Sequence, residues 1–366
     1  MIPIASPQLG EDEINAVADV IRSGMLAQGD VTRQFEESFA NYCGCAHAIG
    51  TNNGTSALHA ALLAAGIQPG DEVIVPDFTF IATATAVSMC GAVPVMVDVD
   101  EKYYTLKPSA VQEAITPKTK AVIGVHLFGQ PFDLRPIQEI CEANNLFLIE
   151  DCAQAHGARC DGVPVGSFGV AGCFSFYPTK NMTTGEGGMV TTQDQELATR
   201  ARQLINHGQS EKYLHTMLGY NYRMPNLMAA IGQVQLKKID QMTKQRQENA
   251  RYFSEHLDTN IFVCPKIRPG CEHVFHQYVI RPGNGCPLSR DELMEYLRQN
   301  GIGSAVHYPI PVHKQPVYQQ EQLSSEISCP VTERLCKEVL SLPVHPGVRE
   351  EECKIICEVL NGVNKA

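Results

Sequence analysis

The sequence has no stretch in which lysine and arginine gather, and acidic residues outnumber basic ones. It contains 29 Lys and Arg residues against 40 Asp and Glu residues, which gives a formal net charge of −11. Nucleic acids and anionic membranes are bound largely through basic patches, so this composition argues against both kinds of partner. A small anionic ligand is still compatible with it, where a few donors converge locally.

The sequence also lacks an apolar run long enough to span a bilayer, which takes about 20 residues. The chain begins Met1-Ile-Pro, without the basic start of a secretory signal. Glu11, Asp12 and Glu13 interrupt the first apolar stretch. We therefore expect a cytoplasmic protein that does not cross or bind membranes.

The 14 cysteines form no Cys-x-x-Cys pair. The closest approaches are Cys43-Gly-Cys45 and Cys353-x-x-x-Cys357, and neither has histidines nearby at the spacing of zinc ligands. We expect reduced thiols in the core and no metal site.

Short apolar runs alternate with helical patterns along most of the first 200 residues. Continuous apolar strands separated by helices indicate a mostly parallel sheet that is buried on both faces. The predicted class is therefore α/β, with a seven-stranded sheet between helices. The predicted strands are His47 to Thr51, Glu72 to Pro76, Val93 to Val97, Ala121 to Val125, Leu146 to Glu150, Gly172 to Phe176 and Gly188 to Thr192.

Helices are expected on both sides of this region, and a smaller α/β domain is expected after it. Residues 11–22 place Ile14, Val17 and Ile21 on one helical face, and residues 31–42 form a second amphipathic pattern. A long polar helix near 241–257 bridges to a strand at 274–280 and a helix at 290–300. The predicted domains are 1–240, with an N-terminal helical arm, and 241–366.

Two residues carry the predicted chemistry. Asp151 follows a buried strand, and Lys180 lies in a loop rich in Ser, Thr and Gly. A lysine forms an imine with an aldehyde only as the neutral amine, and a buried carboxylate can keep a pyridine nitrogen protonated. This pair therefore indicates pyridoxal phosphate. Read singly, Lys180 could be a solvated loop lysine and Asp151 a helix cap or turn residue.

Two further segments could hold the phosphate and the ring of that cofactor. Gly54, Thr55 and Ser56 open a predicted helix, whose N-terminus favours an anion, and Ser175 could add a hydroxyl. A plain helix cap explains the first pattern equally well. Phe78 and Phe80 lie at a strand-to-helix turn, where one could stack on the ring while the other packs in the core.

Five ordered motifs together resemble the DegT/DnrJ/EryC1/StrS family of pyridoxal-phosphate-dependent aminotransferases, which act mainly on nucleotide-linked keto sugars. The resemblance covers nearly the whole chain. The motifs are Asn53-Gly-Thr55, Pro76-Asp-Phe-Thr-Phe80, Glu150-Asp-Cys-Ala-Gln-Ala-His-Gly157, Ser175-Phe-x-x-x-Lys180-x-x-Thr-x-Gly-Glu-Gly-Gly188 and Gly219-Tyr-Asn-Tyr-Arg-Met224.

The resemblance implies a fold-type I homodimer with active sites shared between subunits. Lys180 would be the Schiff-base lysine, Asp151 the partner of the pyridine nitrogen, and Gln154 a neighbour of the ring. His156 is a further neighbour at a less uniform position. The remaining implied roles are stacking for Phe80, phosphate binding for Gly54, Thr55 and Ser175, and phosphate binding in the other subunit for Asn221.

The same resemblance implies transamination of a nucleotide-linked keto sugar, with L-glutamate as donor. The segment His207 to His215 resembles enzymes that aminate C3, whereas the opening residues and 219–224 also resemble 4-keto enzymes, so C3 is favoured over C4. Candidate substrate contacts are His307, Tyr308, His313 and Arg223, with Lys212, Arg22 and Arg33 as candidate contributors to nucleotide binding. For His307 and His313, which lie in Pro-rich turns, a purely structural role is equally open.

Two alternatives come from the same resemblance. Some relatives of this fold are regulatory or sensory modules, but these usually carry an added DNA-binding segment, which is not evident here. Dehydratases of the family replace the lysine or add cysteine-bound clusters, whereas Lys180 is present in this chain.

Overall fold

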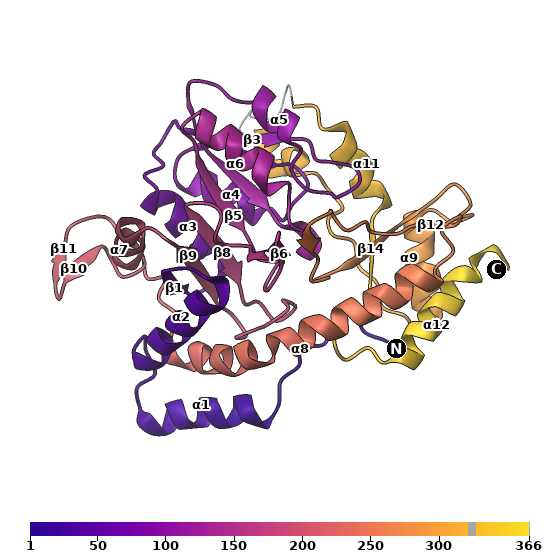
Figure 1. Ribbon diagram of the computed structural model, residues 1–366, viewed down its shortest axis with the longest axis horizontal. Helices are drawn as coiled ribbons and strands as arrows, with labels where there is room; N and C mark the ends of the chain where they lie inside the picture. Colours follow the sequence, from indigo (N-terminus) through magenta and orange to yellow (C-terminus); the bar gives the residue numbers. More distant parts are fainter. Residues whose placement is uncertain (321–326, 366) are drawn as a thin grey trace.

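The computed structural model describes residues 1–320 and 327–365. At its centre lies a seven-stranded sheet with the strand order β1-β9-β8-β5-β4-β2-β3 (Figure 1). Its strands are β1 (His47–Thr51), β2 (Glu72–Pro76), β3 (Val93–Val97), β4 (Thr119–Val125), β5 (Phe147–Asp151), β8 (Ala171–Ser175) and β9 (Gly188–Thr192).

The sheet is parallel except for β9, which is antiparallel to both of its neighbours, β1 and β8. Its strands read as continuous apolar runs because both faces are covered. In β2, Val73 and Val75 point into one core cluster and Ile74 into another. The α/β class and the mostly parallel sheet predicted from the sequence are confirmed.

Two sets of helices cover the faces of the sheet. One core cluster joins the sheet to α2 (Asp30–Cys43), α5 (Pro108–Glu113), α6 (Leu134–Ala143) and α8 (Asn226–His256). The other joins it to α3 (Gly54–Ala64), α4 (Ala82–Met89) and α7 (Gln195–Leu204). The first helix, α1 (Glu11–Ser23), packs along α8.

The C-terminal part has a core of its own around a three-stranded sheet, in the order β12-β14-β15. Helix α8 runs from the large sheet into this part, where Ala250 and Phe253 join the second core (Figure 1). Its elements are β12 (Phe262–Val263), β14 (Tyr278–Pro282), α9 (Arg290–Gln299), α10 (Pro316–Gln320), α11 (Pro330–Glu338), β15 (Leu340–Leu342) and α12 (Glu350–Asn361).

The N-terminal end of the chain also contributes to this C-terminal core. Ile2 is buried there and forms a bridge with Ile302. The predicted boundary between residues 240 and 241 falls inside α8. The division into domains 1–240 and 241–366 stays a prediction.

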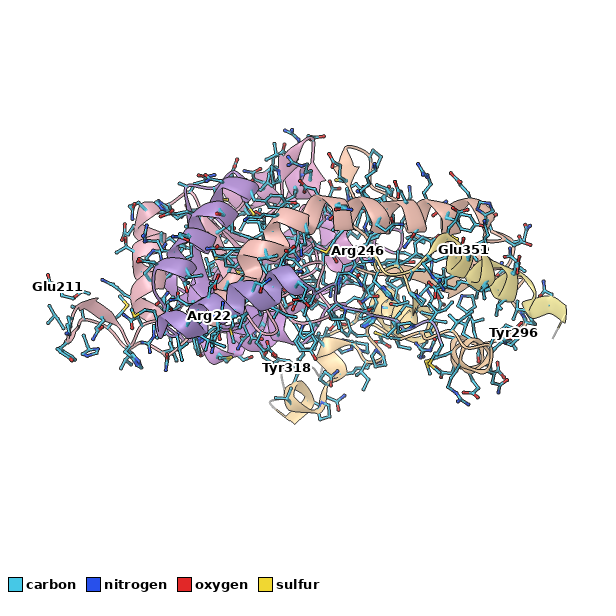
Figure 2. The ribbon with its side chains drawn as sticks, turned by 90° about the horizontal axis from the view of Figure 1, so that it is seen from below. Arg22, Glu211, Arg246, Tyr296, Tyr318 and Glu351 are labelled. Atoms are coloured by element: carbon cyan, nitrogen blue, oxygen red, sulfur yellow. The ribbon has the colours of Figure 1, made fainter. Side chains whose placement is uncertain are left out.

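Short strand pairs complete the fold. β6 (Arg159–Cys160) lies between β7 (Val163–Pro164) and β13 (Cys271–Glu272). The hairpin β10 (Gln209–Glu211) and β11 (Leu214–His215) projects from the large sheet region, and Figure 2 places Glu211 at one extremity of the molecule. The hairpin exposes Tyr213 and Leu214, which are 80% and 51% exposed, and Leu218 just beyond it is 92% exposed.

Two expectations about secondary structure need correction. The strand predicted from 274 begins only at Tyr278, because the N–H groups of Val274 and Gln277 bond to the carbonyls of Gly129 and Phe128 in the large part instead. In α1, Ile14 and Ile21 are not buried against this chain, since each is 59% exposed.

All 14 cysteines are unpaired and 12 of them are buried, as expected for core thiols. In the described ranges, no helix has the length and apolar character needed to cross a membrane.

Candidate active site

The predicted site residues meet at the edge of the large sheet where the parallel strands end. Asp151 is the last residue of β5 and Ser175 is the last residue of β8. These two strands are parallel neighbours, so their carboxyl ends lie together. Helix α3 begins beside them, and the loop that carries Lys180 follows β8. Such an edge is where ligands bind in open α/β sheets.

Asp151 is held rigidly at this edge. Its side chain is 6% exposed. One carboxylate oxygen accepts a hydrogen bond from the Thr83 hydroxyl at 2.8 Å, and the other accepts from the backbone N–H of Ala153 at 3.1 Å. Burial raises the pKa of Asp151, while these hydrogen bonds and the charge of Lys180 oppose the rise. No helix follows, so Asp151 ends its strand without capping a helix.

Lys180 as a whole is half-buried, and its amine is surrounded by protein atoms. Burial lowers the pKa of Lys180 to about 8, and the nearby charge of Asp151 limits the shift. Among the described residues, no carboxylate oxygen lies within ion-pairing distance of its Nζ. A substantial fraction of the amine is therefore neutral near physiological pH, as imine chemistry requires.

The start of α3 forms a cradle against Ser175. Asn53 caps the helix by accepting a hydrogen bond from the N–H of Ser56 at 2.8 Å. The N–H groups of Gly54 and Thr55 lie in the first turn, where no carbonyl of the helix can reach them. A Cβ on Gly54 would lie 2.7 Å from the Cβ of Ser175, so only glycine allows this approach. The site has the donors that an anion prefers.

Two aromatic rings border the same space. Phe80 is 54% exposed, whereas Phe78 is buried in the core, so one phenylalanine packs and the other is free to stack. The ring of Tyr308 lies 5.8 Å from that of Phe80. Gln154 accepts a hydrogen bond from the N–H of Phe128 at 2.7 Å and donates one to the Tyr308 hydroxyl at 2.9 Å.

His307 also lies near Lys180, whereas His313 is paired with Asp77. Burial, followed by the charge of Lys180, lowers the pKa of His307 to about 4. Its Nδ1 lies 2.9 Å from the hydroxyl of Ser341. His313 is buried, and its Nδ1 lies 2.6 Å from a carboxylate oxygen of Asp77. That bond anchors the 312–314 turn to the end of β2, so His313 acts as scaffold.

The other predicted residues lie further along this edge. Arg223 donates a hydrogen bond to the side chain of Asn206 and forms a bridge with Thr51 at the end of β1. Asn221 is exposed and pairs through its backbone with Asn206. Lys212 is exposed on the projecting hairpin. Asn221 and Lys212 are thus exposed, whereas Arg223 is half-buried at the end of β1, beside the segment that leads into α3.

His156 is a buried polar residue with mostly aromatic neighbours. Its ring is buried beside Phe174 and Phe176, and neither ring nitrogen has a hydrogen-bond partner among the described residues. Burial lowers the pKa of His156 to about 3, and the charge of Lys180 contributes. His156 is therefore a neutral neighbour of Lys180.

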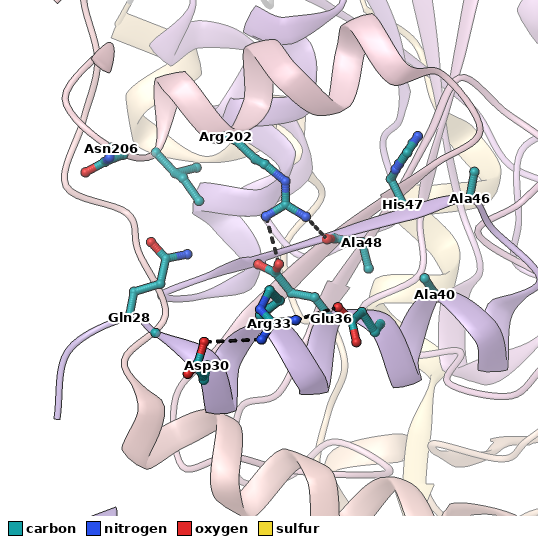
Figure 3. A pocket seen from close by; sticks show the side chains of 13 residues that line it. Gln28, Asp30, Arg33, Glu36, Ala40, Ala46, His47, Ala48, Arg202 and Asn206 are labelled. Carbon is teal, nitrogen blue, oxygen red and sulfur yellow. Dashed lines mark hydrogen bonds and ion pairs between the residues drawn. The ribbon is translucent and has the colours of Figure 1, made fainter. Parts of the chain in front are cut away.

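A separate hollow on the surface lies between α2, β1 and α7 (Figure 3). Arg202 donates to Glu36 at 2.7 Å within it, and Arg33 pairs with Asp30 and Glu37. Arg22 pairs with Asp19 on α1. The charges of Arg22 and Arg33 are thus already matched by acidic residues of their own helices.

Two buried groups have the residue types of metal sites: Asp77, His313 and Cys329, and His126, Glu150 and Cys152. In the first group, Asp77 and His313 already bond to each other. In the second, Glu150 accepts hydrogen bonds from the N–H groups of Gly166, Phe168 and Gly169 and contacts His126 at 3.0 Å. These contacts are structural, and the expected absence of a metal stays a prediction.

Sequence analysis missed Thr83, which fixes Asp151 from the neighbouring helix α4. A threonine that follows the Pro76 to Phe80 turn by one helical turn is the signal that could have found it. The sequence alone could not show that its hydroxyl faces β5.

Comparisons with known proteins agree with this geometry. The family model described as the DegT/DnrJ/EryC1/StrS aminotransferase family matches residues 7–361. A "Pleiotropic regulatory protein" of Geobacillus stearothermophilus is 42% identical over 96% of this chain and 94% of its own length. A "UDP-N-acetyl-3-dehydro-alpha-D-glucosamine 3-aminotranferase" of Acidithiobacillus ferrooxidans is also 42% identical, with the same coverage. A "GDP-perosamine synthase" of Caulobacter vibrioides is 39% identical over 99% of this chain and 98% of its own length.

Solved structures show the same fold. The crystal structure of S. venezuelae DesV in complex with a ketimine intermediate has a TM-score of 0.92 and 39% identity, and the match covers 97% of this chain and 94% of that one. NtdA from Bacillus subtilis, with bound cofactor PMP, has a TM-score of 0.90 and 32% identity, and the match covers 97% of this chain and 82% of that one.

These matches identify pyridoxal phosphate as the cofactor, and the residues present fit it. The close approach of Gly54 to Ser175 leaves donors for a phosphate. Asp151 offers a carboxylate for the ring nitrogen, and Lys180 offers an amine that is partly neutral. The ring nitrogens of His156, which have no hydrogen-bond partner among the described residues, place polar atoms near that amine. Phe80 and Tyr308 would border the ring.

Proposed function

The chain belongs to the DegT/DnrJ/EryC1/StrS aminotransferase family, and on this premise we propose that it transfers an amino group from L-glutamate to C3 of a nucleotide-linked 3-keto sugar. The observation that carries the proposal is the pairing, at one sheet edge, of a buried carboxylate with a lysine whose pKa is about 8. The product would be an amino-sugar nucleotide for polysaccharide, glycan or secondary-metabolite synthesis.

Bound pyridoxal phosphate supplies an aldehyde that accepts the amino group and a cationic ring that withdraws electrons. Asp151 would hold the proton on the ring nitrogen, since a buried carboxylate favours the charged pyridinium. The Nζ of Lys180 would take the α-proton of the donor and return a proton at the adjoining carbon. A base with a pKa near the working pH is suited to move a proton in both directions.

The remaining side chains would bind and orient. Gly54, Thr55 and Ser175 would receive the phosphate, with Asn221 of a second subunit reaching it across the interface. Phe80 would stack on the ring, and Gln154 with Tyr308 would close its edge against water. The phosphate contacts would place the reacting carbon beside Lys180 in every cycle.

The homodimer is part of this proposal. Its support is the projecting hairpin, on which Tyr213 and Leu214 are exposed, together with the exposed Asn221 next to it. Exposed apolar side chains on an extended element are typical of surfaces that meet another chain. Cytoplasmic location and the absence of membrane or nucleic-acid partners stay predictions.

Amination at C3 rather than C4 is supported by the names of several relatives. Besides the aminotransferase of A. ferrooxidans, two are named for dTDP-3-amino sugars, one from Streptomyces venezuelae and one from Aneurinibacillus thermoaerophilus, and each is 41% identical to this chain. The GDP-perosamine synthase represents the 4-keto alternative.

A second candidate function is a cofactor-binding regulatory module without turnover. Its basis is the name of the pleiotropic regulatory protein, which is 42% identical to this chain. A purely regulatory site needs a cradle for the cofactor, but it has no need for an amine held partly neutral beside a buried carboxylate. The site geometry therefore favours turnover.

The test is to add L-glutamate to the purified protein loaded with cofactor. Transamination predicts loss of the visible absorbance band and release of 2-oxoglutarate, and a panel of UDP-, GDP- and dTDP-linked 3-keto and 4-keto sugars then identifies the acceptor. Lys180→Arg should abolish both signals, whereas Lys118→Arg, at an exposed position, should not. Retained transamination in Lys180→Arg would overturn the assignment, and a stable cofactor band with no 2-oxoglutarate would favour the regulatory module.

A further inference from the structure

Two cysteines from distant parts of the chain face each other across a short strand pair. Cys160 ends β6, in the large part, and Cys271 begins β13, which lies beyond α8. They are direct partners in the antiparallel β6–β13 pair. The thiol of Cys271 donates a hydrogen bond to Cys160, and the two Sγ atoms lie 3.3 Å apart.

The backbone of this strand pair suits a disulfide. The N–H of Asp161 donates to the carbonyl of Gly270 at 2.6 Å, so these two residues form a hydrogen-bonded position of the ladder. Cys160 and Cys271 occupy the adjacent position, which has no ladder hydrogen bonds and where facing Cα atoms lie about 4.5 Å apart. Disulfides span Cα separations of about 4.4–6.8 Å. The pairing of the strands therefore already places both cysteines within that range.

The two thiols differ in how far solvent reaches them. Cys271 is half-buried, whereas Cys160 is 8% exposed. A small reagent can therefore reach Cys271 first, and Cys160 lies beside it to complete the reaction. Cys286 is another half-buried cysteine, but its thiol donates to the carbonyl of Leu288 at 3.4 Å instead of to a sulfur.

Burial makes both thiols slow to ionise. It raises the pKa of Cys160 and, together with the hydrogen bond to Cys160, raises the pKa of Cys271 to about 12. The charged groups that act on the two thiols are Asp133, Arg135, Asp161 and Arg268. Because only the thiolate attacks a disulfide, oxidation of this pair should be slow at neutral pH and faster in alkali.

The segment that carries Cys271 contacts the large part beside the candidate site. Residues 270–277 are held there by hydrogen bonds, one of which runs from the N–H of Val274 to the carbonyl of Gly129. Further along the same segment, His276 contacts the side chain of Asn181, the residue after the candidate lysine. A covalent bond at Cys271 would therefore fix a segment that lies against the lysine loop.

We propose that Cys160 and Cys271 form a reversible disulfide that ties residues 270–277 to the large part, with a small-molecule disulfide such as oxidised glutathione as the oxidant. The thiolate of Cys271 attacks one sulfur of the oxidant and releases one glutathione thiolate. The thiolate of Cys160 then attacks the mixed disulfide on Cys271 and releases the second. The protein loses two hydrogens, and one oxidised glutathione becomes two glutathione thiols. This inference does not depend on the proposed function.

The first test is mass spectrometry of the reduced, cofactor-loaded protein after incubation with oxidised glutathione at about pH 8. We expect a bond between Cys160 and Cys271, located by fragment ions, and recovery of both thiols with dithiothreitol. Cys160→Ser should instead accumulate glutathione on Cys271, because the second thiol is missing. Cys286→Ser, which changes the other half-buried cysteine, should form the bond at the parental rate.

The rate of bond formation gives a second readout. It should rise about tenfold per pH unit between about pH 7 and 9, since the thiolate fraction rises tenfold per unit below the pKa. A rate that does not change with pH would overturn the assignment of this buried pair as the reacting thiols.

The third test compares amide hydrogen exchange in the oxidised and reduced protein. Peptides that cover residues 270–277 should exchange about tenfold more slowly after oxidation, because local opening is restricted. The β10–β11 hairpin should exchange alike in both forms. The urea midpoint should also rise on oxidation, since the bond joins residues 111 positions apart. The double variant Cys160→Ser with Cys271→Ser should show neither change.

Three outcomes would overturn the proposal. One is stable glutathione on Cys271 of the parent protein without the bond to Cys160, and another is a bond that joins two chains. The third is a bond that forms within the chain but changes exchange in residues 270–277 by less than twofold, which refutes the tether. If Cys160→Ser does not fold, Cys271→Ser takes its place, and an intramolecular bond that persists there refutes the assignment equally.

Discussion

Replacing Gly54 with alanine should disturb both the packing of α3 on β8 and the binding of the cofactor phosphate. The added Cβ would lie 2.7 Å from the Cβ of Ser175 and 3.2 Å from its Cα. Carbon atoms in contact prefer a separation of about 3.5–4.0 Å, so the two elements must move apart by about 1 Å.

The energetic cost follows from two opposing effects. Overpacking of this kind costs about 1–3 kcal/mol, while replacing glycine by alanine gains about 0.4–1 kcal/mol from the unfolded chain. We expect a net loss of about 1–2 kcal/mol in the free energy of unfolding, measured in urea. Because the shift also displaces the N–H groups of Gly54 and Thr55, affinity for pyridoxal phosphate should fall about tenfold or more.

Two variants control this experiment. Gly10→Ala also changes a glycine that caps a helix, but its Cβ would meet only Glu13 Oε2 at 3.9 Å, so it should leave both quantities unchanged. The double variant Gly54→Ala with Ser175→Gly removes the clashing Cβ and should recover most of the stability while losing the hydroxyl. A Gly54→Ala protein with parental stability and cofactor affinity would refute the steric reasoning.

Three further predictions follow from the same site. The pKa of Lys180 is about 8 instead of 10.5, so the unfolded chain binds more protons between these pH values. The cofactor-free protein should therefore gain stability as pH rises across that interval, and Lys180→Met should flatten the rise in urea midpoints. His313→Ala should lower stability by about 3 kcal/mol in the same assay, because Asp77 loses its buried partner, yet keep the parental KM for the donor. Tyr308→Phe removes the acceptor for Gln154 and should weaken cofactor binding by roughly fivefold in an absorbance titration, with an unchanged affinity contradicting its role.

The sequence predicted the central sheet well because its strands are apolar runs bounded by turn residues. The bounds of β1, β2, β3 and β9 agree with the prediction at both ends. The prediction failed where tertiary contacts replace the strand ladder. Val274 and Phe275 are apolar, as in a strand, but the N–H groups of Val274 and Gln277 bond to the carbonyls of Gly129 and Phe128, and Phe275 takes a positive φ of 45°.

The residues of the candidate site also differ in whether local sequence features or tertiary contacts define them. Lys180, Asp151 and Gly54 could be found from the sequence, since strand ends and helix starts are local features that meet at one sheet edge. Thr83 could not, because its contact with Asp151 depends on which way α4 faces. For His313 the sequence left a substrate contact and a structural role equally open, because the pairing of its imidazole with Asp77, 236 positions earlier, is a tertiary contact.

The contacts between the two parts of the chain explain why the site needs both of them. Tyr308 comes from the C-terminal part and accepts a hydrogen bond from Gln154 of the large part. Next to Lys180 in the sequence, the side chain of Asn181 contacts His276 and donates a hydrogen bond to the carbonyl of Val274. Residues beyond α8 thus contact both Gln154 and Asn181, the residue that follows Lys180. A change in how the two parts meet would therefore move the Tyr308 ring relative to Phe80 and Gln154, which border the candidate site.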